Sequence, residues 1–245
     1  MGLTPTQRPL IGGAIVCALD QEGVTPVTIT SLVEHGTVGA LSLRNEPVQA
    51  RSTARLAGLL DAAAAVIDEL GYERLTTAMV AERAGASIGT VYRYFPDRIA
   101  VLQALASRNL ERTLAQVTQE IADDSHTSWL EALTAAFDVF KRAFEQEPGF
   151  RSLRVGDVID LQPNPNDRTY NSVVAETMLN ALAERFDLAV TDETRFAFEV
   201  AIEISDALAS RAFTFDPHGE TAFLQAGRET VYALLVRHFG EPRKS

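Results

Sequence analysis

Apolar residues recur at helical spacing from Arg55 onward. Seven of them follow the i, i+3, i+4, i+7 rule, and Gly71 stands where such a helix would end. These positions are Leu56, Leu59, Leu60, Ala63, Ala64, Ile67 and Leu70. The pattern predicts an amphipathic helix from Arg55 to Leu70 with one buried face.

Three further helices follow closely, each opened by a residue that can cap it. Polar side chains stand before the apolar runs, while Gly85 and Pro96 interrupt them. The expected segments are a short helix from Thr76-Thr77 through Ala84, a second from Ser87 to Phe95, and a long helix from Asp97 to about Ala122. Two short helices are thus predicted between two longer ones.

The rest of the chain continues in helical periods. Ser128 and Glu131 have capping-box spacing, which predicts a helix that runs to Pro148-Gly149. The segments expected beyond it are a piece from Phe150, then 167–186, 192–213 and 219–239, with a break at 162–167. We therefore expect an all-α protein.

Residues 1–50 differ from this pattern, because they are rich in Gly, Thr and Val and have no helical period. They predict a flexible extension or a small accessory element, and the stretch VTPVTITSLV could pass as a strand. The expected organisation is an extension over 1–50, a three-helix helix-turn-helix domain over 51–98 and a helical body over 99–245.

Charge is unevenly distributed along the chain. The net charge is −11, yet residues 51–98 are neutral, while residues 99–245 carry fourteen basic and twenty-three acidic side chains. Between Arg83 and Arg98, three arginines face the single Asp97. An acidic body beside a locally basic segment disfavours indiscriminate polyanion binding and still allows one specific site.

Several kinds of chemistry have no support in the sequence. Cys17 is the only cysteine, and the four histidines are scattered without metal-ligand spacing, so we expect no metal and no cofactor. No apolar run approaches the length of a membrane span and no secretory signal is convincing, which favours the cytoplasm.

The segment around Gly85 meets the physical demands of a helix-turn-helix. Glycine tolerates the dihedrals of the tight turn, and small or apolar residues allow the two helices to pack closely. The inward-facing candidates are Val80, Ala81, Ala84, Ala86 and Val91. The second helix, called the reading helix below, begins with short side chains suited to the major groove, and at least one of Tyr92 and Tyr94 should point its hydroxyl outward.

This stretch resembles the DNA-binding signature of the tetracycline-repressor (TetR) family over about residues 52–112, with the helix-turn-helix at about 76–95. The matching residues are Gly71-Tyr72, Thr76-Thr77, Val80-Ala81, Ala84-Gly85, Ser87-Ile88-Gly89-Thr90 and Tyr92-Arg93-Tyr94-Phe95. Arg98 replaces the family's usual lysine and keeps its charge.

The resemblance implies a set of DNA contacts and a partner. The positions that commonly meet DNA are Thr77, Ser87, Gly89, Thr90, Tyr92, Tyr94 and Arg98. Ile88 and Arg93 are expected to set base preference, while Arg51 and Arg55 could add phosphate contacts from an arm before the first helix. The partner would be a double-stranded operator.

The body is expected to hold an effector pocket lined mainly by aromatic side chains. The candidates are Trp129, Phe137, Phe140, Phe144, Phe150, Leu153, Val158, Tyr170 and Met178. Arg154 and Asp157 are one turn apart and could orient a ligand, although their spacing favours an ordinary intrahelical ion pair. Each aromatic residue also has the simpler interpretation of a core residue.

The last two helices carry apolar residues on more than one face, which predicts a second neighbour such as the same helices of another copy. The candidate interface residues are Phe196, Val200, Ile204, Leu208, Phe223, Gly227 and Val231. The resemblance implies the same two-fold dimer. Gly227 also needs a reason for standing inside a helix, such as a close approach of a neighbouring helix.

The function that these features favour is a ligand-responsive regulator, most simply a repressor that binds a near-palindromic operator as a homodimer and is released by a small apolar or aromatic molecule. The long 99–122 helix is the expected lever between body and reading helix. The alternatives are an all-helical small-molecule carrier or enzyme without DNA function, although no catalytic motif supports one, and a purely architectural DNA binder.

Overall fold

The computed structural model describes residues 15–16, 27–28, 46–155 and 169–242. The described chain is helical except for two short antiparallel strands, β1 (Ile15–Val16) and β2 (Val27–Thr28), of which β2 falls inside VTPVTITSLV. The helices are α2 (Glu46–Leu70), the 3-10 turn η2 (Tyr72–Arg74), α3 (Thr77–Arg83), α4 (Ile88–Tyr94), α5 (Arg98–Ile121), α6 (Trp129–Gln146), α7 (Phe150–Val155), α8 (Tyr170–Phe186), α9 (Asp192–Phe213) and α10 (Thr221–Phe239). The all-α expectation is confirmed.

The first long helix begins earlier than the apolar pattern indicates. It starts at Glu46, nine residues before the predicted start at Arg55, so that prediction was wrong. Pro47 lies in its first turn, where the missing N–H costs no intrahelical hydrogen bond. Arg51 and Arg55 consequently lie on α2 and not on an arm that precedes it.

The helix starts around the turn are set by the side chains that the sequence indicates. The Thr76 hydroxyl accepts from the Met79 N–H at 3.2 Å, and Ser87 Oγ accepts from the Thr90 N–H at 3.1 Å. Each such cap satisfies an amide that the helix itself leaves unpaired. The predicted boundaries of α3 and α4 are therefore confirmed.

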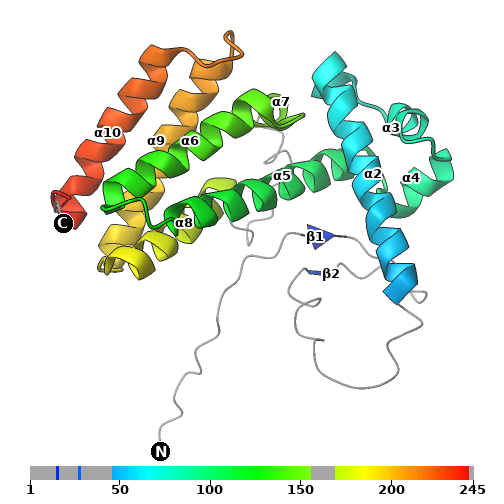
Figure 1. Cartoon of the computed structure of the whole chain (residues 1–245). Coiled ribbons are helices and arrows are strands. Elements are labelled where there is room, and N and C mark those ends of the chain that lie inside the picture. The colour runs from blue at the N-terminus through cyan, green and yellow to red at the C-terminus, as the bar shows by residue number, and fades with distance from the viewer. Residues whose placement is uncertain (1–14, 17–26, 29–45, 156–168, 243–245) are drawn as a thin grey trace, which may run out of the picture.

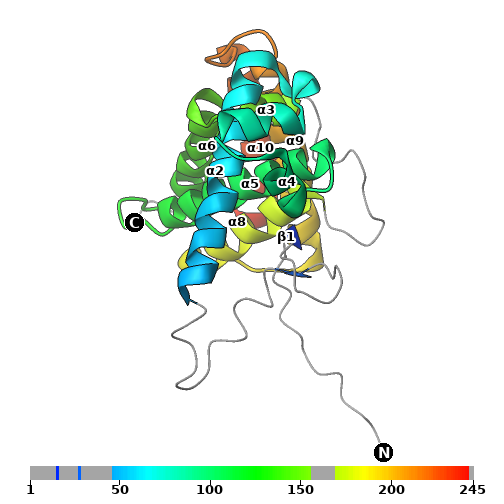
Figure 2. The same cartoon turned by 90° about the vertical axis from the view of Figure 1, so that its right-hand side faces the viewer.

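The molecule has two parts joined by α5. Figure 1 shows α2, α3 and α4 gathered at one end of α5, with α6, α8, α9 and α10 beyond them, and Figure 2 views the molecule from the α2–α4 end. We call α2–α4 with the first turns of α5 the N-terminal domain, and the remaining helices the body.

The core of the N-terminal domain does not stop at residue 98. It includes Val101, Leu102 and Leu105 of α5, together with Leu153 of α7, which is 1% exposed. The first turns of α5 and the body helix α7 thus contribute to this core. Because cores are close-packed, a displacement of α5 or α7 shifts the side chains of the N-terminal domain that pack against it.

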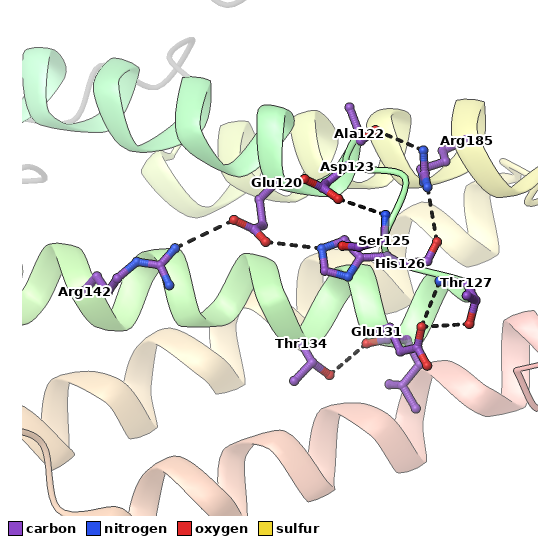
Figure 3. A network of polar contacts seen from close by, with 11 residues as sticks. Glu120, Ala122, Asp123, Ser125, His126, Thr127, Glu131, Thr134, Arg142 and Arg185 are labelled. Carbon is purple, nitrogen blue, oxygen red and sulfur yellow. Dashed lines mark hydrogen bonds and ion pairs between the residues drawn. The ribbon is translucent and has the colours of Figure 1, made fainter.

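The far end of α5 is fixed by a polar network at the turn into α6 (Figure 3). His126 Nε2 lies 3.2 Å from Glu120 Oε1, and the Arg185 guanidinium of α8 donates to the carbonyl oxygens of Ala122 and His126 at 3.0 and 3.1 Å. Glu131 accepts from the Thr127 N–H at 2.8 Å. In a capping box, this carboxylate would instead accept from the backbone N–H of Ser128, the N-cap residue.

Candidate functional site

The leading edge of α4 faces solvent. Ser87, Ile88 and Gly89 are exposed and Tyr92 is 54% exposed, whereas Val91 and Phe95 are buried against α2 and α5. One side of this short helix therefore packs against the protein, and the opposite side is free to enter a DNA groove.

The turn before α4 has the geometry of a helix-turn-helix. Gly85 adopts φ +57°, which a residue with a side chain rarely accepts. The Ala86 N–H donates to the Ala81 carbonyl at 2.9 Å and closes the turn. A substitution at Gly85 would carry this strain even though open space surrounds it.

The two tyrosines of the reading helix have different roles. The Thr77 hydroxyl donates to the exposed Tyr92 hydroxyl at 3.3 Å, which links α3 to α4. The Tyr94 hydroxyl lies 3.1 Å from Ser52 Oγ on α2, and its ring is half-buried. Tyr92 is therefore the tyrosine that points outward, as expected for at least one of them.

The predicted basic contacts divide into free and engaged groups. Arg51, Arg55 and Arg93 are exposed, so their side chains can reach a backbone phosphate. Arg98 is half-buried, and its Nη1 donates to the Glu73 carbonyl at 2.7 Å and braces η2. The phosphate contact expected of Arg98 remains a prediction. It would use the guanidinium nitrogens other than Nη1.

Arg83 adds less to the basic face than its charge suggests. Its two Nη atoms donate to Glu69 of α2 at 2.7 and 2.5 Å. This pairing holds the pKa of the Glu69 carboxyl below its usual value. The local surplus of positive charge therefore rests on Arg93 and Arg98.

A cavity lies in the body among α6, α7, α8, α9 and α10. It encloses about 760 Å³ of atom-free space, which includes solvent at its mouth, and it lies beside α7. The predicted pocket residues that line it are Phe137, Phe140, Phe144, Phe150, Arg154 and Tyr170. This agrees with the expected aromatic lining.

Three of the predicted pocket residues are placed elsewhere. Trp129 is buried and packs edge-on against Phe239, with ring centroids 5.7 Å apart, and Met178 and Leu153 are fully buried core residues. Helical periodicity identifies buried positions but not which buried side borders a void, so these assignments were wrong. Asp157 and Val158 lie outside the described residues.

One end of the cavity is polar, and two of its four residues were not predicted from the sequence. Arg154 pairs with Asp206 of α9, and its Nη2 also donates to Asn171 Oδ1 at 3.2 Å. The guanidinium lies over the Tyr170 ring, 3.9 Å from the centroid. Asn171 lies on α8 and Asp206 on α9, and neither belongs to a sequence motif. Only the fold brings them together. We call Arg154, Tyr170, Asn171 and Asp206 the polar end.

The predicted dimer residues do not share one surface. Val231 is 1% exposed inside the body core. Gly227 packs against Leu208, whose Cδ1 lies 3.5 Å from the position that a Cβ on Gly227 would occupy. Those two assignments are corrected by the structure, which uses Gly227 for a close approach of α9 to α10. Leu208, Phe223 and Gly227 border the cavity instead.

Other residues of α9 and α10 do face outward. Phe196 is 69% exposed, and Val200 and Ile204 are half-buried. The small exposed residues beside them, which the apolar pattern does not reveal, are Ala207, Ala226, Thr230 and Ala233. Small side chains allow a second helix pair to approach closely, so this face remains the candidate dimer surface.

A helix-turn-helix with an exposed reading edge, joined to a helical body with an aromatic cavity, defines the class of ligand-sensing transcriptional regulators. The family model described as bacterial regulatory proteins, tetR family, matches residues 59–105, and that of the tetracyclin repressor-like C-terminal domain matches residues 127–239. A crystal structure of a TetR-family transcriptional regulator from Streptomyces coelicolor is 33% identical with a TM-score of 0.63, over 75% of this chain and 99% of that one. The chain belongs to the TetR family of bacterial regulators.

Curated relatives match over shorter stretches. The HTH-type transcriptional repressor KstR of Rhodococcus jostii is 34% identical over 87 residues, which are 35% of this chain and 41% of that protein. The nucleoid occlusion factor SlmA of Pasteurella multocida is 39% identical over 61 residues, which are 24% of this chain and 30% of that protein. The chain thus matches less than half the length of either relative.

No helix among the described residues is long and apolar enough to cross a membrane.

Proposed function

We propose that this protein is a ligand-responsive transcriptional repressor and not an enzyme, that it acts in the cytoplasm, and that it binds a near-palindromic operator as a homodimer. A small molecule in the body cavity would release the DNA. A two-fold dimer places two reading helices on successive major-groove faces, about 34–36 Å apart. Repression requires that spacing, and an effector that prefers another spacing shifts the population away from DNA.

The observation that carries this proposal is the double role of α7. Phe150 and Arg154 border the cavity, while Leu153 of the same helix is buried in the core of the N-terminal domain. The Gly149 N–H, at the start of α7, donates to Asp68 Oδ1 of α2 at 2.8 Å. A ligand that pushes on α7 therefore pushes on α2.

The lever is α5, held at its far end. The network around His126 and Arg185 fixes its last turn to α6 and α8 (Figure 3). Its first turns belong to the core of the N-terminal domain. A displacement at α7 would thus swing the reading helix about this fixed end and alter the separation between the two helices of the dimer.

The function is tested with duplex DNA that flanks the protein's own gene, in a mobility-shift assay. We expect a sharp shift that is lost when Thr90 and Tyr92 are both changed to alanine. A screen for compounds that abolish the shift then supplies an effector. No shift with any such DNA, combined with turnover of a small molecule, would establish the enzyme alternative.

The lever is tested separately by electron-spin distance measurements. Spin labels are attached at Glu82→Cys of α3 in a Cys17→Ser background, which leaves one labelled site per protomer. Effector should change the distance between labels in the dimer. An effector that releases DNA while this distance stays constant contradicts the lever and leaves DNA binding intact.

A further inference from the structure

The polar end of the cavity contains a hydroxyl without a partner. Tyr170 is 8% exposed, borders the cavity, and its Oη makes no hydrogen bond in the structure. Burial holds the pKa of the phenol well above its usual value, so the proton stays on the oxygen. A buried donor of this kind is costly to leave unpaired, and a ligand atom that accepts from it would remove that cost.

The positive charges around the cavity are already compensated. Arg154 pairs with Asp206, Arg228 pairs with Asp138, and Lys141 Nζ lies 2.5 Å from Glu145 Oε1. All three basic residues border the cavity. Each of the three positive charges is therefore already paired with a carboxylate of the protein, and a ligand carboxylate would have to compete for it.

A further carboxylate tips the balance toward negative charge. Asn171 Nδ2 donates to Glu203 Oε2 at 2.9 Å and to Asp206 Oδ2 at 3.4 Å, so two acidic groups of α9 converge on one asparagine. Arg154 is the cation that the structure places among them, and its side chain is 8% exposed. With the solvent-exposed Glu203 counted, which does not itself border the cavity, this cluster carries one more negative than positive charge among the described residues.

We infer that the cavity takes an uncharged effector, with an apolar part against the aromatic lining and one hydrogen-bond acceptor that receives the Tyr170 hydroxyl proton. This inference rests on the proposed function and names the class of its effector. A carboxylate would lose its hydration, meet a guanidinium that is already paired, and face surplus negative charge. An ammonium group has no acceptor, so it would leave the Tyr170 proton unpaired.

The test uses four probes with one carbon skeleton: 4-phenylbutan-1-ol, 4-phenylbutanoate, 4-phenylbutylammonium and butylbenzene. Each is titrated calorimetrically into the full chain near neutral pH. We expect the alcohol to bind about tenfold or more tightly than either ion, because a buried polar group left unpaired costs at least about that factor in affinity.

Two variants separate the hydroxyl from the charge. Tyr170→Phe should weaken the alcohol about fivefold to tenfold, the effect of one lost hydrogen bond, and leave butylbenzene unchanged. Glu203→Gln should raise the affinity for 4-phenylbutanoate severalfold and leave the alcohol unchanged. Tyr232→Phe makes the same chemical change on α10, where the hydroxyl bonds Glu241 at 2.7 Å, and should alter nothing.

Three results would overturn the inference. Either ion binding as tightly as the alcohol contradicts an uncharged effector, and an unchanged alcohol-to-butylbenzene ratio in Tyr170→Phe removes the hydroxyl from recognition. If no probe binds while the operator shift is intact, the cavity is not an effector site. That last result also ends the effector part of the proposed function, whereas the first two leave it standing.

Discussion

At the reading edge, some residues are needed by the fold and others are not. Val91 and Phe95 are buried, and Ser87 caps α4. Gly89 has none of these duties, because the nearest atom to a Cβ built there is Ser87 Oγ at 3.9 Å. We therefore predict that its lack of a side chain serves close approach to the DNA groove.

We predict that Gly89→Ala leaves the melting temperature unchanged or higher and weakens operator binding about tenfold or more. Alanine favours the helix, whereas one lost base contact costs about 1–3 kcal/mol. Thermal unfolding and a mobility-shift titration measure the two effects. A variant that melts earlier and binds DNA normally would show that the fold, and not the groove, requires this glycine.

Tyr92→Phe removes one exposed hydroxyl together with the hydrogen bond that it accepts from Thr77. We expect operator affinity to fall roughly fivefold to tenfold, equivalent to about 1–1.4 kcal/mol for a lost phosphate contact. Fluorescence anisotropy with labelled operator measures it. Tyr232→Phe, the same change on α10, is the matched control and should bind as the wild type does. Equal affinity for Tyr92→Phe and the control would remove this hydroxyl from the interface.

At the scale of elements, the junction before α7 depends on backbone geometry. Gly149 has φ +75°, and a Cβ there would stand 3.4 Å from Leu105 Cδ2 and 3.6 Å from the Ala64 Cα. Gly58, in the middle of α2, has nothing within 4 Å. The two glycines thus offer one substitution in two opposite settings.

Gly149→Ala is expected to lower the free energy of unfolding by about 1–3 kcal/mol, because alanine is strained at positive φ. Gly58→Ala should raise it by about 0.5–1 kcal/mol through helix propensity. Urea denaturation compares the two variants with the wild type. Effects of equal sign would contradict the geometry assigned to the α6–α7 turn.

The start of α6 gives a pH-dependent prediction. The backbone N–H and hydroxyl of Thr127 hold the pKa of Glu131 below its usual value. A depressed folded-state pKa contributes stability above the unfolded value of about 4.3 and loses it as the pH falls through the folded value. Glu131→Gln should therefore melt earlier than the wild type at pH 7, and the gap should close near about pH 3. The exposed Glu184→Gln is the control and should show no gap at either pH.

Helix boundaries were predictable because they depend on neighbours in the sequence. Ser87, Thr76 and Asp97 each bond an amide three residues ahead, so capping chemistry locates them without a fold. That Arg154 meets Asn171 and Asp206 was not predictable, since the three residues come from three helices. Only packing decides which side of a helix borders a void. For the same reason, the sequence could not show that Trp129 and Val231 belong to the core.

For the whole molecule, the exposed face of α9 and α10 is the proposed dimer surface. We predict that Ala233→Glu yields a monomer with unchanged helix content, because Ala233 is exposed in the protomer and a carboxylate at a two-fold interface meets its own copy. Operator affinity should fall about a hundredfold or more with the loss of bivalent binding. Light scattering after gel filtration and circular dichroism measure these outcomes.

Ala115→Glu places the same charge on the exposed side of α5 and should remain dimeric. A dimeric Ala233→Glu protein would move the interface off this face. The family's two-fold arrangement was inferred from the resemblance, and Phe196, Val200 and Ile204 of the candidate dimer surface were named from the apolar pattern. The alanine and threonine residues beside them were not named, because such residues leave no apolar stripe in a sequence.

The short helix α7 has a consequence for anyone who adapts this scaffold as a biosensor. Altering Phe150 or Arg154 to retune the small molecule that it detects would also disturb Leu153, which is three positions from Phe150 and next to Arg154, and would so change the baseline of the reporter gene. Libraries that vary only the α8 and α9 walls would change selectivity while the output in the absence of inducer stays constant.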